Sequence, residues 1–179
     1  MRTCRTLLAG TWGLLSLFAA RAGEPQPALT PQAETALRNL FPAAQILAVA
    51  TERERGVRYY EVALRQGQGN IEIEVAPDGS VGEIETRVAP AEVPRAAMEG
   101  ILQATGGSAV LEVERHEVRG APQNGTFIPV QPPRVFYEAR YEVEGVRREV
   151  AVSPDGSPLA ADEAEDHQAG AADLDDDDD

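Results

Sequence analysis

The chain has 179 residues, with 16 basic residues against 30 acidic ones, which gives a formal net charge of −14. All of the basic residues are arginines. A strong negative charge repels phosphate backbones and anionic membranes, so nucleic acid is not expected as a partner. The single cysteine, Cys4, excludes an internal disulfide and a cysteine zinc cluster.

The first 22 residues have the layout of a secretory signal peptide. Arg2 and Arg5 precede the apolar residues 7–20, and an Ala-Arg-Ala cleavage site ends at Ala22. The apolar stretch is short for a membrane-spanning helix, which needs about 20 residues. An uncleaved anchor is the alternative. We therefore expect an exported protein, periplasmic or extracellular, with no membrane span after cleavage.

Residues 162–179 form an acidic tail that holds ten of the acidic residues and no basic one. Such a segment cannot bury enough apolar surface to offset its ordering entropy, so we expect it to be disordered. Its last five residues attract divalent cations weakly, as any polyanion does, and they are Asp175, Asp176, Asp177, Asp178 and Asp179. No cofactor and no defined metal site is predicted there.

An internal repeat organises the region between these ends. Tyr59-Tyr60-Glu61 leads to Pro77-Asp78-Gly79, and Phe136-Tyr137-Glu138 leads at the same interval to Pro154-Asp155-Gly156. Upstream the match continues at a shorter offset, which implies an insertion in the second copy within residues 121–134. The predicted organisation is a linker at 23–29, a first repeat at 30–90 and a second repeat at 91–161 with an inserted loop at 121–134.

Each copy opens with a helical pattern. The first helix starts at Thr30-Pro31, with Glu34 completing a capping box, and ends before Pro42. The second starts at Val93-Pro94 and ends at Gly106-Gly107.

Alternating apolar and charged residues after each helix predict half-buried antiparallel strands. A fourth strand is expected at 81–87 in the first copy, and a weak counterpart at 158–161 in the second. The predicted fold class is α+β: two repeats, each one helix packed on a three- to four-stranded antiparallel meander sheet. The two copies are expected to pack against each other.

This order of elements resembles the PepSY-like, beta-lactamase-inhibitor-like domain of secreted bacterial proteins over roughly residues 30–160. The motifs that carry it are Tyr59–Val62, Ile71–Val75, Pro77–Gly79, Phe136–Glu138, Val150–Val152 and Pro154–Gly156. The resemblance implies an exported protein without catalytic residues or a cofactor, and it suggests inhibition of another protein.

Apolar side chains in the insertion are the main candidates for partner binding. Phe127, Ile128 and Val130 lie among four prolines, which stiffen a loop and lower the entropy lost on binding. The alternative is that the loop folds back over its own domain. Tyr59 and Phe136 are expected on the outer face of the sheet, where they form either a binding surface or the seam between the copies.

His116 is the one histidine in the predicted repeats. On a strand it shares a face with Glu112 and Glu114, which is a metal-binding pattern, although a solvent-facing strand with alternating charges is the favoured interpretation. No catalytic triad can be built around one histidine, so no enzyme is predicted. The predicted function is an exported, non-catalytic module that binds, and inhibits or regulates, another exported protein. The alternative is a calcium-linked or surface-associated structural protein that acts through its acidic tail.

Overall fold

The computed structural model describes residues 26–123 and 125–159. The predicted signal peptide and acidic tail, including Asp175–Asp179, lie outside these ranges. The elements in chain order are α2 (Pro31–Leu40), β1 (Gln45–Glu54), β2 (Val57–Gln66), β3 (Gly69–Val75), β4 (Val81–Arg87), a short 3₁₀ turn (Pro90–Glu92), α3 (Arg95–Ala104), β5 (Val110–Gln123), β6 (Thr126–Val143) and β7 (Val146–Val152).

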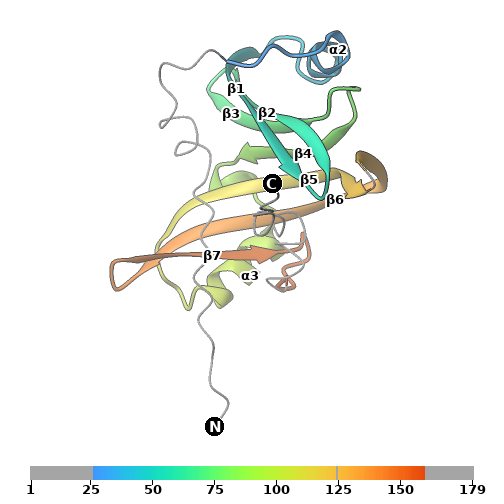
Figure 1. Cartoon of the computed structure of the whole chain (residues 1–179). Helices are drawn as coiled ribbons and strands as arrows, with labels where there is room; N and C mark the ends of the chain where they lie inside the picture. The colour runs from blue at the N-terminus through green and yellow to red at the C-terminus, as the bar shows by residue number, and fades with distance from the viewer. Residues whose placement is uncertain (1–25, 124, 160–179) are drawn as a thin grey trace, which may run out of the picture.

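All seven strands form one antiparallel sheet, in the order β1-β2-β3-β4-β5-β6-β7 (Figure 1). The prediction of two repeats, each with its own small sheet, is therefore wrong. The two halves are joined where β4 pairs with β5, from Glu83↔Val118 to Arg87↔Glu114. This pairing satisfies backbone groups that two separate sheets would leave unpaired at their edges.

Both helices lie on the same face of this sheet. The α2 side packs on a core around Val62, Leu64 and Ile73. The α3 side packs on a second core, which includes Val113 and Ala139. Because side chains alternate along each strand and the register is continuous across the sheet, the residues beside these core positions point to the opposite face.

Several local predictions are confirmed. Thr30 is the N-cap of α2, and its hydroxyl accepts a hydrogen bond of 3.2 Å from the backbone N–H of Ala33. Glu34 does not complete a capping box, because its carboxylate pairs with Arg38 one turn later. The turn at Pro77-Asp78-Gly79 forms as expected, with Asp78 accepting a hydrogen bond from the Ser80 backbone.

Residues 121–134 are not a loop. Residues 121–123 end β5 and residues 126–134 begin β6, so the expected insertion extends a long hairpin. Pro122 faces Phe127 across the hairpin, and Gly120 faces Pro129. Residues 126–129 are therefore paired with β5, whereas residues 130–133 lie in a register shift between the pairs of Pro129 and Arg134.

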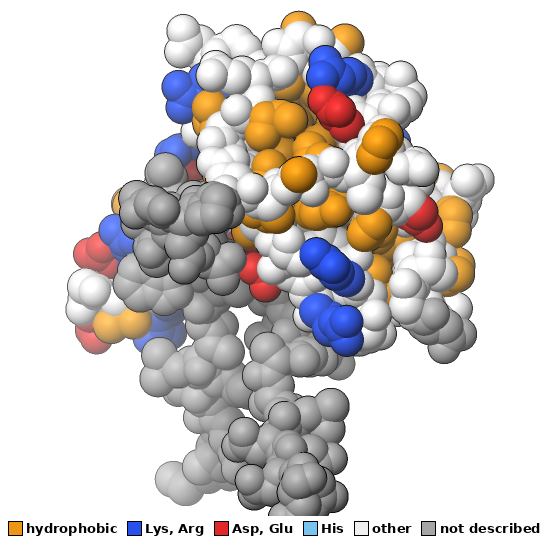
Figure 2. Space-filling model, turned by 45° about the horizontal axis from the view of Figure 1, so that its top comes forward, with side chains coloured by type: hydrophobic (Ala, Val, Ile, Leu, Met, Phe, Trp, Pro, Cys, Tyr) orange, Lys and Arg blue, Asp and Glu red, His pale blue; other side chains and the backbone are white. Residues whose placement is uncertain are grey.

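Exposed hydrophobic side chains are concentrated on one part of the surface. On the face shown in Figure 2, hydrophobic side chains gather over the upper part of the molecule and few acidic ones interrupt them. The larger hydrophobic residues that stay exposed are Ile46, Leu47, Leu102, Leu111, Ile128 and Val146. Among the described residues, neither helix is long and apolar enough to cross a bilayer.

Candidate functional site

The face of the sheet that carries no helix is lined with acidic side chains. The register sets glutamates side by side on neighbouring strands: Glu61 faces Glu74 and Glu72 faces Glu85. Farther across, Glu85 faces His116. We call this surface the carboxylate face, and its members are Glu61, Glu72, Glu74, Glu83, Glu85, Glu114 and Glu138, with His116 and Arg140 among them.

Many of these carboxylates are buried, which is unusual for glutamate. The exposed fraction is 7% for Glu72, 6% for Glu83 and 2% for Glu114. Part of the burial comes from the β5–β6 hairpin, whose Phe127 packs on Tyr59 with ring centroids 5.8 Å apart. The hairpin tip therefore closes one end of the carboxylate face.

Gly82 permits this close approach. A Cβ at position 82 would lie 2.6 Å from a carboxylate oxygen of Glu74 and 2.7 Å from the ring of Phe127. Real Cβ atoms do not come so close to other heavy atoms, so any larger residue would push the hairpin tip away. A glycine in the interior of a strand often marks a place where another segment packs closely on the strand. At Gly82 that segment is the β5–β6 hairpin.

A small hollow opens over β2, β3 and β4. Its lining consists of Glu61, Glu72, Glu74, Glu83 and Glu85, together with Ile73. The enclosed space has room for about one water molecule, far less than a small-molecule site needs. A cationic group would therefore meet these carboxylates at the mouth of the hollow.

Burial raises the pKa of three carboxyls around this hollow, those of Glu72, Glu74 and Glu85. It raises the pKa of Glu72 to about 11, and the hydrogen bond and negative charge of Glu61 add to the effect. The pKa of Glu74 is also raised well above its usual value, first by burial and then by the charge of Glu83. Glu61 and Glu72 each keep one buried oxygen without a hydrogen-bond partner. Without a bound cation, Glu72 keeps its proton at neutral pH.

This protonation predicts an unusual dependence of stability on pH. Glu72 holds its proton in the folded state at pH values where the unfolded chain, with an ordinary carboxyl pKa, has lost it. The folded state then binds more protons, so the free energy of unfolding should fall as pH rises above about 4.5. Glu72→Gln removes this pH-dependent loss of stability, and its amide N–H can still donate a hydrogen bond to Glu61. We expect E72Q to match the wild type at pH 4.5 and to exceed it by at least about 1 kcal/mol at pH 8, which is one pKa unit.

Urea unfolding of both proteins at the two pH values checks this expectation. Glu99→Gln, in an exposed pair with Arg95 on α3, is the matched control because its carboxylate is solvated in both states. Equal stabilities of E72Q and wild type at pH 8 would contradict a buried, protonated Glu72.

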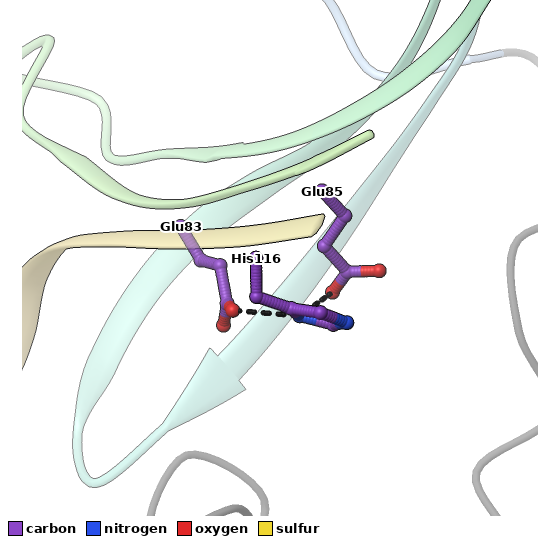
Figure 3. Close-up of side chains that lie close together, drawn as sticks. All are labelled: Glu83, Glu85 and His116. Atoms are coloured by element: carbon purple, nitrogen blue, oxygen red, sulfur yellow. Dashed lines mark hydrogen bonds and ion pairs between the residues drawn. The ribbon is translucent and has the colours of Figure 1, made fainter. Parts of the chain in front are cut away.

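His116 connects the two halves of the carboxylate face. Its Nδ1 lies 2.9 Å from a carboxylate oxygen of Glu83 and 3.9 Å from one of Glu85 (Figure 3). Its ring stacks on Phe136, with centroids 4.4 Å apart. Burial lowers the pKa of His116, but the hydrogen bond that it donates to Glu83 and the charge of Glu85 outweigh burial and raise the pKa to about 9.

Arg140 neutralises the other end of the face. Its guanidinium lies 2.5 Å from Glu114, 3.2 Å from Glu112 and 3.2 Å from Glu149. Burial raises the pKa of Glu114, and the charge of Arg140 opposes this rise. Glu138 is less enclosed, and burial raises its pKa to about 7 although the charge of His116 lowers it.

Two groups on this face have the composition of a metal site. In the first, one ligand atom each from Glu83, Glu85 and His116 lie within 4.8 Å of one another. In the second, the same holds for Glu114, His116 and Glu138. Both groups contain His116, so the ring nitrogen that is free to bind a metal ion determines which group can form a site.

The structure separates the partner-binding residues that the sequence predicted. Phe127 is 4% exposed and Phe136 is 3% exposed, whereas Ile128 is 44% exposed. Tyr59 and Val130 are half-buried. Phe127 thus follows the alternative in which the segment folds back over its own sheet, and of the three hairpin residues Ile128 alone keeps a largely exposed side chain.

The interpretation of His116 as part of a solvent-facing strand is wrong, because the histidine is 7% exposed. Glu112 and Glu114 do share its face, as their common partner Arg140 shows. The partners on β4, Glu83 and Glu85, were not predicted. Their alternation in the sequence marked a polar face, but the crossing hairpin that covers this face lies more than 30 residues away.

No protein-family model matches the sequence, and no curated protein matches it significantly. Solved structures do share the fold. A BLIP-like protein from Bacteroides fragilis is 18% identical, with a TM-score of 0.55 over 79% of this chain and 89% of that one. A protein of Bacteroides eggerthii described as periplasmic is 13% identical, with a TM-score of 0.57 over 75% and 88%.

A DUF2874 family protein from Bacteroides uniformis is also 13% identical, with a TM-score of 0.57 over 74% of this chain and 88% of that one. At these identities the likeness concerns the fold alone. It supports the beta-lactamase-inhibitor-like side of the resemblance, whereas the PepSY-like side and the internal repeat stay predictions.

Proposed function

We propose that this protein is an exported, non-catalytic module that binds a basic segment of another exported protein on its carboxylate face. The observation that carries the proposal is the hollow lined by five glutamates. In the described ranges, none of these five carboxylates forms an ion pair with an arginine. Carboxyls without arginine partners can release their protons and pair with a cationic group, so this cluster favours such a group over other ligands.

Export is supported by two independent observations. The N-terminal sequence has the order of a signal peptide, and a structure with the same fold belongs to a protein described as periplasmic. The mature chain would lack its single cysteine. It would therefore fold outside the cytoplasm without a disulfide.

A non-catalytic role fits the chemistry of the face. His116 is the one histidine in the described ranges, and its Nδ1 is engaged by Glu83. The hollow is smaller than most substrate sites. The cationic end of an arginine or lysine side chain from a partner protein would lie against these carboxylates at the mouth of the hollow and form charge-assisted hydrogen bonds with them.

Ile128 is the second contact point. It is 44% exposed and follows Phe127, whose ring closes one end of the carboxylate face. As an exposed apolar side chain, Ile128 would give a partner a desolvated contact in addition to the electrostatic contact at the carboxylates, and protein interfaces usually combine the two.

The test is a pair of variants in the full chain, used to capture partners from the exported fraction of the host. We expect Glu61→Gln and Ile128→Ser each to weaken the retained complex at least about tenfold, since one interface contact of 1.4 kcal/mol corresponds to that factor. The interaction should also weaken as salt increases. Phe127→Ser is unsuitable, because Phe127 is buried and its loss would disturb the hairpin.

Leu102→Ser on α3 is the control for Ile128→Ser, because Leu102 is 47% exposed on the helix side of the sheet. If L102S abolishes capture while E61Q and I128S retain it, the partner binds the helix face and the proposal fails. Inhibition of the captured partner is a further expectation. The calcium-linked role of the acidic tail stays a prediction about residues outside the described ranges.

A further inference from the structure

We propose that Glu114, His116 and Glu138 form a binding site for a divalent transition-metal cation of the Zn²⁺ class. This inference is independent of the proposed protein partner. It concerns the β5–β6 part of the carboxylate face, on the far side of His116 from the hollow. One ligand atom from each of the three residues lies within 4.8 Å of the other two.

Two residues of this group each have a buried atom without a hydrogen-bond partner. Nε2 of His116 has no hydrogen-bond partner although the residue is 7% exposed. Oε1 of Glu114 has none although the residue is 2% exposed. Leaving a buried polar atom unpaired costs about 1–3 kcal/mol, so two such atoms in one cluster indicate a missing ligand.

The second atoms of both side chains are held by neighbours. Glu83 binds Nδ1 of His116 at 2.9 Å, which leaves Nε2 on the other side of the ring (Figure 3). Arg140 binds Oε2 of Glu114 at 2.5 Å, which leaves Oε1. A histidine that gives one ring N–H to a carboxylate and offers the other nitrogen is the usual arrangement in metal sites, because the carboxylate fixes the ring and raises its basicity.

The donor set favours a transition metal over calcium or magnesium. One imidazole nitrogen with two carboxylate oxygens suits Zn²⁺, which prefers four ligands. Calcium takes six to eight oxygen ligands, and this cluster does not supply them. Glu138 lies opposite Glu114 on β6 and is half-buried, so it can move the short distance needed to close the site. The fourth position would remain for water or for a group from a partner.

The surrounding charge also favours a cation. Glu83, Glu85, Glu112 and Glu149 lie around the three ligands. In the described ranges two arginines contact this group: Arg140 pairs with Glu112, Glu114 and Glu149, and Arg87 pairs with Glu112. A bound metal ion would replace the proton on Nε2 and neutralise carboxylates that are now close to one another. Metal binding would therefore stabilise the fold, because the unfolded chain has no preformed site.

The experiment titrates the full chain, freed of metal by a chelator, with ZnCl₂. The chain has two histidines, so His167→Gln leaves His116 as the sole ring to observe. In H167Q, nitrogen-15 NMR should show a coordination shift at Nε2 of His116 that saturates at one equivalent of Zn²⁺. An unchanged Nε2 resonance at one equivalent overturns the proposal, and cation uptake would then belong to the acidic residues elsewhere.

A matched pair of variants tests the carboxylate ligands. Glu138→Gln removes a proposed ligand, and Glu149→Gln removes a carboxylate that contacts Arg140 but lies outside the ligand set. We expect E138Q to lose at least about 100-fold in Zn²⁺ affinity by calorimetry, since loss of an outer-shell group alone costs about 10–100-fold. E149Q should stay within about threefold. Equal affinities of E138Q and wild type would overturn the site, and if E138Q does not fold, the NMR result decides alone.

Discussion

Replacing Arg140 by alanine is expected to lower the free energy of unfolding by about 3–5 kcal/mol, the usual cost of removing one partner of a buried ion pair. Arg140 is the guanidinium that contacts Glu112, Glu114 and Glu149 together. Its removal leaves the buried carboxylate of Glu114 without the cation that contacts it, and a buried charge that has lost its partner costs far more than the pair contributes when intact.

A double variant separates this explanation from lost packing. In Arg140→Ala with Glu114→Gln the buried charge is absent, so most of the lost stability should return. Arg38→Ala is the control, because Arg38 forms an exposed pair with Glu34, and we expect it to change stability by less than about 0.5 kcal/mol. Denaturant unfolding in the presence of a chelator measures all four proteins. If the double variant is as unstable as R140A, the buried charge of Glu114 is not the cause.

Replacing Gly100 by alanine is expected to destabilise the fold by about 2–3 kcal/mol, although the same change in a free helix stabilises it by about 1 kcal/mol. Gly100 lies in α3 against the turn at Gly156. A Cβ at position 100 would overlap the carbonyl oxygen of Gly156 and lie 2.9 Å from its Cα. The obstacle is backbone on both sides, so neither partner can move without separating α3 from β7.

The sign of this change makes it informative. Gln103→Ala on the exposed side of the same helix is the control, and we expect it to be neutral or slightly stabilising. Thermal and urea unfolding of both variants test the contact. A G100A protein more stable than the wild type would show that helix propensity outweighs the contact with the Gly156 turn.

The first half of the sheet has a similar but less close contact between a turn glycine and a helix. A Cβ at Gly79, in the turn after β3, would lie 2.9 Å from the carbonyl oxygen of Gln32 in α2. Gly79 also has a φ of 88°, which side chains other than glycine adopt rarely. Thus the two Pro-Asp-Gly turns, which the sequence marked only as turns, are also the points where the helices approach the sheet.

The sequence by itself determined the local structure and the polarity of each strand. Thr30-Pro31 starts α2, the Gly106-Gly107 pair follows the end of α3, and period-two alternation separates Ile71 and Ile73 from Glu72 and Glu74. These features depend on side chains a few residues apart, on turn chemistry and on the two faces of a strand, so one chain segment contains all the information.

Only the tertiary structure decided what covers each face. The pairing of β4 with β5 unites what the repeat suggested were two sheets, and it brings Glu83 and Glu85 to His116 across some 30 residues of chain. The β5–β6 hairpin carries Phe127 over the carboxylate face and turns residues expected to be solvated into buried groups. Alternation tells which residues share a face, but burial and pKa depend on the segments that pack on that face, and a local pattern contains no record of them.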